Sequence, residues 1–167
     1  LWYQKFMANF NLAPVISAIP NQNTAEGSNF TPIQLDNYVS DVEDADQYIT
    51  WTSSQLSTSN LNITINANRQ AIITPKDANW SGSQTVVFTA TDRGKSGVNI
   101  KSDKDTVVFS ISAVNDPPTI TGQSALSVNE DASLALSLSN FTVTDPDSDP
   151  STFQLVVLPG SNYTVTG

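Results

Sequence analysis

The stretch Ala113-Val114-Asn115-Asp116-Pro117-Pro118-Thr119-Ile120 marks the point at which one run of short β-strands ends and another begins. Neither proline has an N–H group to donate to a sheet, and each fixes its own φ angle, so a strand that enters Pro117-Pro118 must stop there. An amide and a carboxylate, Asn115 and Asp116, lie directly before the proline pair. We therefore interpret this stretch as a joint between two domains that carries polar groups.

Seven short segments before the joint have the composition of β-strands. They are rich in β-branched and aromatic residues, they alternate in polarity, and turn residues separate them. They cover residues 15–17, 29–31, 48–51, 61–65, 71–74, 85–90 and 106–111. Seven strands within about 100 residues predict an all-β, antiparallel β-sandwich of the immunoglobulin-like type. Because the chain has no Cys, we expect apolar contacts to hold the core, from Trp51, Ile49, Phe88, Phe109 and Ile111.

The sequence after the joint repeats the sequence before it at a constant offset of 104 residues, which indicates tandem domains. The matched pairs are Pro14 and Pro118, Asn11 and Asn115, Glu26 and Glu130, Asp41 and Asp145, and Glu43 and Asp147. In the second copy we expect strands within residues 134–139, 153–158 and 163–165. The prediction is thus two tandem sandwiches, with the first in residues 11–116 and the N-terminal half of the second in residues 117–167.

An incomplete sandwich exposes apolar side chains and unpaired strand edges. Two interpretations remain open at this point. Either the chain is a fragment of a longer protein, or a neighbouring molecule supplies the missing strands.

Residues 1–10 show a different pattern, in which Trp2, Tyr3, Phe6, Met7 and Phe10 are spaced as on one face of a short helix. A helix of this length is unstable alone in water, so this apolar face needs a partner. We interpret the segment as a linker or the tail of an upstream region. The alternative is a docking segment that packs against another copy or donates a strand to it.

The composition limits the classes of function. The net charge of −9 and the pI of about 4.1 argue against a nucleic-acid partner, which requires a basic face. The absence of Cys and His removes disulfide bonds, thiol nucleophiles and the side chain that most often transfers protons. No apolar run approaches the ~20 residues that span a bilayer, so we expect no membrane insertion. Abundant Ser, Thr and Asn fit an extracellular or cell-surface protein.

Acidic residues are predicted to converge at the joint. In an antiparallel sandwich alternate loops lie at the same pole, which places Glu26, Asp77 and the Asn115-Asp116 exit together. The loop of residues 145–149, with Asp145 and Asp147, is expected to face the same joint. Carboxylates at such density repel one another unless a cation compensates them, and oxygen ligands in a flexible shell favour Ca²⁺. The alternative is a set of solvated turn residues.

A second acidic group is predicted at the opposite pole of the first domain. The acidic stretch of residues 41–46, with Asp41, Glu43 and Asp44, should lie there together with Asp92 and Asn11. We expect a weaker cation site, because Asn11-Leu12-Ala13-Pro14 lacks the acid of the later joint. Asp92 could instead initiate a turn. We interpret Asp103 and Asp105, in the hairpin with Lys101 and Lys104, as part of a solvated face.

Four motifs together resemble a cadherin repeat, and more closely the cadherin-like or Ig-like repeats of long prokaryotic surface proteins. They are Ala90-Thr91-Asp92-Arg93-Gly94, the joint itself, Ala25-Glu26-Gly27 and Asp145-Pro146-Asp147. The resemblance covers about residues 11–167, and it implies calcium bound by the acids of these motifs. Ala113 and Pro117 replace two ligands of the family's linker, and its DRE motif is reduced to Asp77. This implies about one ion per joint and a dissociation constant of about 10⁻⁴ to 10⁻³ M.

The sequence therefore predicts an extracellular structural or adhesive segment, such as a stalk, an adhesin spacer or a filament subunit, with a calcium-stiffened joint. Its expected partners are neighbouring repeats or copies of itself, with a cell-surface or polysaccharide ligand as a further option. The alternatives are an accessory carbohydrate-binding module of a secreted enzyme and a strand-exchanging fibre subunit. Paired carboxylates can hydrolyse glycosides, but here they lie in turns without an aromatic cleft, so we expect no enzyme activity.

Overall fold

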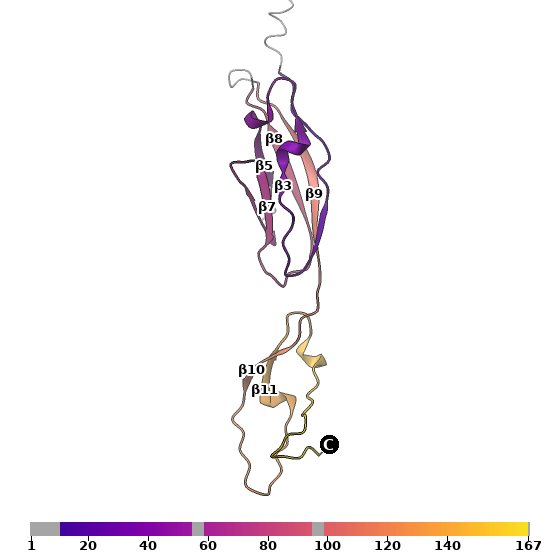
Figure 1. The fold of residues 1–167 in the computed structure, drawn as a ribbon, viewed down its shortest axis with the longest axis vertical. Helices are drawn as coiled ribbons and strands as arrows, with labels where there is room; N and C mark the ends of the chain where they lie inside the picture. Colours follow the sequence, from indigo (N-terminus) through magenta and orange to yellow (C-terminus); the bar gives the residue numbers. More distant parts are fainter. Residues whose placement is uncertain (1–10, 55–58, 95–98, 167) are drawn as a thin grey trace, which may run out of the picture. The chain divides into compact units, whose positions relative to one another are not determined.

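The computed structural model describes residues 11–54, 59–94 and 99–166. The helical pattern predicted for residues 1–10 lies outside the described residues. The chain divides into two compact units, of which unit 1 ends at Val114 and unit 2 begins at Asn115 (Figure 1). The change of unit thus falls two residues before the predicted boundary. No helix in the described part is both long enough and apolar enough to cross a lipid bilayer.

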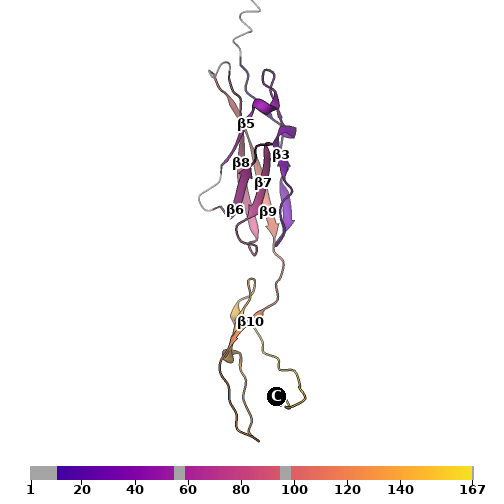
Figure 2. The ribbon, with the colours of Figure 1, turned by 60° about the vertical axis from the view of Figure 1, so that its left-hand side comes forward.

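Unit 1 is a β-sandwich of two main sheets (Figure 2). The first sheet has the order β2-β9-β8-β5, with β2 at Gln22–Ala25, β9 at Ser102–Ser112, β8 at Gly82–Thr91 and β5 at Thr50–Ser54. The second has the order β3-β7-β6, with β3 at Ile33–Gln34, β7 at Gln70–Pro75 and β6 at Leu61–Ile65. A separate two-stranded sheet consists of β1 at Val15–Ile16 and β4 at Val39–Ser40. The short 3₁₀ helices η1 and η2 cover Leu35–Tyr38 and Asp46–Tyr48.

The two longest strands follow the period of two that their sequences predict. Val86, Phe88 and Ala90 of β8 are fully buried, and their neighbours along the strand are less so. β9 alternates in the same way. Phe109 of β9 meets Phe30 edge to face, with ring centroids 5.1 Å apart. The predicted core is confirmed, because all five of its members are buried in one cluster: Ile49, Trp51, Phe88, Phe109 and Ile111.

The structure also contains a strand that the sequence does not reveal. β2 pairs in parallel with β9, from Gln22 opposite Phe109 to Ala25 opposite Ser112, so the sandwich is not wholly antiparallel. Asn23 and Ala25 belong to residue types that are depleted in strands, which hides this edge strand from a composition-based prediction. The strand expected at residues 29–31 is wrong: Phe30 is buried there, but Pro32 follows, and the strand begins at Ile33.

Asp103 and Asp105 do not form a merely solvated face. The Asp103 carboxylate accepts a hydrogen bond from Ile16 N at 2.8 Å, and the Asp105 carboxylate accepts one from Ile19 N at 2.7 Å. β1 has only two residue pairs with β4. These two hydrogen bonds therefore hold residues 16–19 against β9.

Unit 2 repeats the backbone of the first part of unit 1 at the offset of 104 residues. Its strands are β10 at Thr119–Gln123 and β11 at Phe141–Thr144, and its 3₁₀ helices are η3 at Leu138–Asn140 and η4 at Pro150–Thr152. Thr119 pairs with Thr144 as Val15 pairs with Ser40. Asp131 has a φ of 62°, and its counterpart Gly27 has a φ of 73°. The internal repeat is therefore structural as well as sequential.

The strands predicted at residues 134–139, 153–158 and 163–165 do not form in unit 2, where only an isolated bridge joins Gly160 and Tyr163. In unit 1 the counterpart of residues 154–158 is β5, which pairs with β8. The described residues of unit 2 include no counterpart of β8, and a strand requires a partner for its backbone groups. Apolar side chains are correspondingly open: Leu134 is 42% exposed, whereas its counterpart Phe30 is 5% exposed.

Candidate functional site

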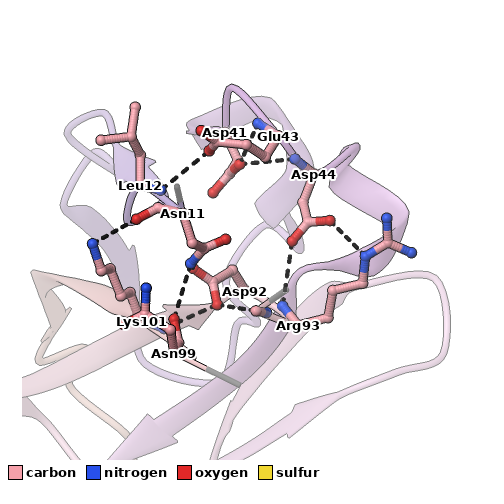
Figure 3. Close-up of polar contacts among 10 residues, drawn as sticks. Asn11, Leu12, Asp41, Glu43, Asp44, Asp92, Arg93, Asn99 and Lys101 are labelled. Atoms are coloured by element: carbon pink, nitrogen blue, oxygen red, sulfur yellow. Dashed lines mark hydrogen bonds and ion pairs between the residues drawn. The ribbon is translucent and has the colours of Figure 1, made fainter. Parts of the chain in front are cut away.

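The acidic residues predicted as ligands lie in three groups, two in unit 1 and one in unit 2. The first group is the upstream pole, which we define by Asn11, Asp41, Glu43, Asp44, Asp92, Arg93 and Lys101 (Figure 3). Asn11 precedes β1, residues 41–44 follow β4, Asp92 and Arg93 follow β8, and Lys101 precedes β9. The reversal of chain direction at each strand brings these four loops to one end of unit 1.

Asp92 is held by donors from three segments. It is 3% exposed. Its Oδ1 accepts hydrogen bonds from Gly94 N and Lys101 N, each at 2.9 Å, and its Oδ2 accepts one from Asn11 Nδ2 at 2.7 Å. Both oxygens of this carboxylate therefore have protein donors, as a buried charge requires.

Lys101 continues this network. Its Nζ donates to the main-chain oxygen of Asn11 at 2.6 Å, and Asn11 Nδ2 also donates to Asn99 O at 3.0 Å. Three segments, which are the entry to the domain, the end of β8 and the start of β9, are thus linked by Asn11, Asp92 and Lys101.

Asp44 forms an ion pair with Arg93 at the same pole. The Asp44 side chain is 4% exposed, and its Oδ1 lies 2.6 Å from Arg93 Nε. The Arg93 guanidinium also lies over the Tyr48 ring, 3.8 Å from its centroid, a cation–π contact. The buried charge of Asp44 is therefore compensated within the protein.

Asp41 and Glu43 complete the pole. Asp41 Oδ1 accepts hydrogen bonds from Glu43 N and Asp44 N, each at 2.8 Å, which closes a turn. Glu43 Oε2 accepts one from Leu12 N at 3.2 Å. The other oxygen of Asp41 is buried and has no hydrogen-bond partner in the described part of the chain. A buried oxygen of this kind fits a bound cation.

The second group lies where unit 1 ends. Glu26 Oε2 accepts a hydrogen bond from Val114 N at 3.0 Å, while Glu26 Oε1 is buried and lacks a partner among the described residues. Gly27 N donates to Ala78 O at 3.2 Å, so the loop that carries Asp77 adjoins the loop that carries Glu26. Asp77 itself is exposed, and its Oδ1 accepts from Asn79 N at 3.0 Å.

The third group belongs to unit 2 and repeats the turn of the upstream pole. Asp145 Oδ1 accepts hydrogen bonds from Asp147 N and Ser148 N, each at 2.8 Å. Asp147 Oδ2 accepts one from Asp116 N at 2.6 Å, as Glu43 accepts one from Leu12 N. Asn115 Nδ2 donates to Asp116 O at 3.1 Å. Unit 2 thus brings Asn115, Asp116, Asp145 and Asp147 together.

Next to this turn, the pKa of Asp149 lies below its ordinary value. Its carboxylate accepts a hydrogen bond from the backbone N–H of Ser151 at 2.8 Å, and the Ser151 side chain adds to the effect. Hydrogen bonds to the ionised form keep this acid charged.

No three or more acidic side chains of the described residues converge in an arrangement that could hold a metal ion. The sequence interpretation also missed two members of the upstream pole, Arg93 and Lys101. Arg93 had a usable signal, since it follows Asp92 directly. Lys101 had none, because it reaches Asn11 across 90 positions.

Comparison with models of known protein families shows the family to which unit 1 belongs. A family model described as a bacterial Ig domain matches residues 11–110, which is more than half of the chain. The chain belongs to the bacterial Ig domain family. The match begins at Asn11 of the upstream pole and reaches into β9 of this Ig domain.

Solved structures share the fold of this bacterial Ig domain protein at low sequence identity. Drosophila N-cadherin EC1-4 has a TM-score of 0.50 and 17% identity, over 83% of this chain and 35% of that chain. Human CDH23 EC21-23 has a TM-score of 0.50 and 17% identity, over 84% of this chain and 48% of that chain. The chain therefore spans less than half the length of these structures. The comparison with curated proteins found no match.

Proposed function

We propose that this bacterial Ig domain chain is a segment of an extracellular surface protein that acts as a structural or adhesive spacer and catalyses no reaction. The proposal rests on the cadherin-like fold, on the backbone repeat at 104 residues, and on acidic turns at the ends of the units. Such a spacer transmits position and force between its neighbours, which are other repeats or copies of itself.

We further propose that calcium binds the acidic ends and stiffens the joint. The observation that carries this is the charge of unit 2: its residues 115–167 include six acidic side chains and no Lys or Arg. The turn of Asp145 and Asp147 therefore has no basic side chain of its own unit to compensate it. Ca²⁺ would supply that positive charge and would take oxygen ligands without requiring His or Cys.

The proposed ligands are Glu26 and Asp77 of unit 1 and Asn115, Asp116, Asp145 and Asp147 of unit 2. Glu26 is suited to this role because one of its carboxylate oxygens is buried without a hydrogen-bond partner in the described residues. Its other oxygen binds Val114 N, and Val114 is joined directly to the first residue of unit 2. An ion held by Glu26 would therefore restrict the peptide at the change of unit. Asp41, Glu43 and Asp92 remain proposed ligands of a weaker, upstream site.

Small-angle scattering of the full chain in calcium and in chelator tests the stiffening. We expect a longer maximum dimension and a narrower distance distribution in calcium. The matched control is a variant with Asp145→Asn and Asp147→Asn, which keeps the size of both side chains and should respond little to calcium. An unchanged maximum dimension of the wild type in calcium and chelator would refute a stiffened joint, and calorimetry would show whether calcium binds at all.

The exposed apolar side chains of unit 2 favour a neighbouring repeat or a second copy of the chain as its partner. Ile120 is 60% exposed and Leu134 is 42% exposed, whereas their counterparts at the offset of 104, Ile16 and Phe30, lie against or within the core of unit 1. In unit 1 the sheet of β8 and β9 completes the fold around the corresponding segments. Further strands, from a continuing chain or from a second copy, would cover these side chains. A carbohydrate ligand has less support, since Tyr48 and Tyr163 are the only large exposed aromatic side chains of the described residues.

A further inference from the structure

We infer that Lys101 and Arg93 are built-in cations of the upstream pole, which therefore keeps its structure without calcium. This inference rests on the proposed function, in which calcium compensates the acidic ends of the repeats. It goes further because it assigns a different source of positive charge to each of the two acidic turns. Cationic side chains of unit 1 balance the charge of the turn at Asp41, whereas the turn at Asp145 depends on an added ion.

The contacts of Asp92 carry the first step. Asn11 Nδ2, Gly94 N and Lys101 N occupy three of the about four lone-pair sites of this carboxylate, so a metal ion that bound through both oxygens would have to displace one of these donors. Asn11 and Asp92 are each 3% exposed, so a released donor would remain buried. A buried donor without an acceptor destabilises the folded protein. Asp92 is therefore already held in place by donors of the protein and needs no added cation for its position.

Lys101 carries the second step. A main-chain carbonyl is a common ligand of Ca²⁺, and the Asn11 carbonyl faces this pole. The ammonium group of Lys101 already binds that oxygen at 2.6 Å. A divalent ion at the same oxygen would have to displace the ammonium group and would be repelled by it.

Arg93 carries the third step, and unit 2 provides the contrast. Asp44 is 6% exposed and pairs with Arg93, whereas the residue 104 positions later, Ser148, is uncharged. The upstream pole thus has four carboxylates, from Asp41, Glu43, Asp44 and Asp92, together with two cationic side chains. The turn at Asp145 has the same backbone hydrogen bonds but no Lys or Arg within residues 115–167.

The test removes one of the built-in charges from the full chain. Lys101→Met keeps the length of the apolar stem and removes the ammonium group. Lys104→Met, three residues further along, makes the same change at an exposed side chain and is the matched control. Trp51 and Trp80 report the unfolding of unit 1, because residues 115–167 contain no Trp.

We expect the thermal midpoint of unit 1 in the wild type to be the same in calcium and in chelator. In Lys101→Met it should fall in chelator and recover in calcium, and the variant should gain a calcium-binding step at least ~10-fold tighter than any step at this pole in the wild type. Lys101→Arg, which restores the charge, should behave as the wild type. The inference is overturned if Lys101→Met responds to calcium no more than Lys104→Met does, or if unit 1 of the wild type already loses stability in chelator.

Two further variants test the inference if Lys101→Met does not fold. They also distinguish a failure of this inference from a failure of the proposed function. In calcium calorimetry of the wild-type background, Asp145→Asn should weaken binding strongly and Asp41→Asn should weaken it far less. Equal weakening by both variants overturns the inference and supports calcium binding at both turns. The absence of calcium binding by the wild type overturns the proposed function, while a calcium response gained in Lys101→Met would still support the built-in cation.

Discussion

The side-chain amide of Asn11 donates to the carboxylate of Asp92 at 2.7 Å, across 81 positions of sequence. This contact joins the entry of the domain to the end of β8, and Lys101 closes the link from the start of β9. A site that calcium would be expected to organise is therefore already ordered by hydrogen bonds and ion pairs of the protein. The predictions below test how much this network contributes to stability.

Asp92→Ala is expected to destabilise unit 1 by about 2–4 kcal/mol, because it leaves three donors unsatisfied in a buried place. Urea unfolding followed by Trp fluorescence measures the change. Asp77→Ala is the control, since Asp77 is exposed and its carboxylate accepts a single hydrogen bond from the described residues, that of Asn79 N. Equal losses in the two variants would contradict the role of Asp92 as an anchor.

Arg93→Ala should cost about 2 kcal/mol, because it leaves the buried Asp44 carboxylate without its cation. The double variant with Asp44→Ser, which copies the serine that unit 2 has at position 148, should recover most of that loss. A double-mutant cycle of unfolding free energies measures the coupling between the two side chains. Additive losses would show that the pair contributes little.

Asp103→Ala should loosen the first segment of the domain, because Ile16 N loses its charged acceptor. A hydrogen bond to a charged group is worth about 1.5–3 kcal/mol, and partial exposure favours the lower end. Hydrogen exchange should become faster at Ile16, while the amides of β8 keep their protection. Lys104→Ala, at the neighbouring position of β9, should leave exchange at Ile16 unchanged.

Asp149 gives a prediction for pH. Its pKa in the folded chain lies below the ordinary value of 3.8 because the folded state donates hydrogen bonds to the ionised form. The local stabilisation is therefore complete above the unfolded value and is lost as the pH falls through the folded value. NMR titration of the Asp149 carboxyl carbon should give a midpoint below 3.8, and the Ser151 amide should shift with the same midpoint. A midpoint at or above 3.8 would contradict the hydrogen bond.

Much of the fold could be predicted because its signals are local. The alternation of β8 and β9, the apolar core around Trp51 and the offset of 104 residues all follow from the order of side chains along the chain. The failures have a common cause, which is pairing between distant segments. β2 forms a strand because its backbone pairs with β9. Residues 153–158 form no strand, because the described residues of unit 2 provide no neighbouring strand for them to pair with.

The candidate site likewise combines local features, which the sequence predicts, with long-range contacts, which it does not predict. The acidic turn at Asp41 and its copy at Asp145 are visible as motifs, because each turn is closed by hydrogen bonds to residues two and three positions away. The contacts of the compensating cations cannot be predicted in this way, since Lys101 reaches Asn11 across 90 positions and Arg93 reaches Asp44 across 49.

The sequence by itself thus determined the all-β class, the joint at Asn115-Asp116-Pro117-Pro118 and the existence of a repeat, because proline chemistry and side-chain alternation act on neighbouring residues. Only the tertiary structure decided which acids of unit 1 are compensated from within. Chain reversal at each strand places Asp44 with Arg93, and Asp92 with Asn11 and the backbone of Lys101. Electrostatic and hydrogen-bond energies depend on distances in space, and those distances are set by the whole sandwich.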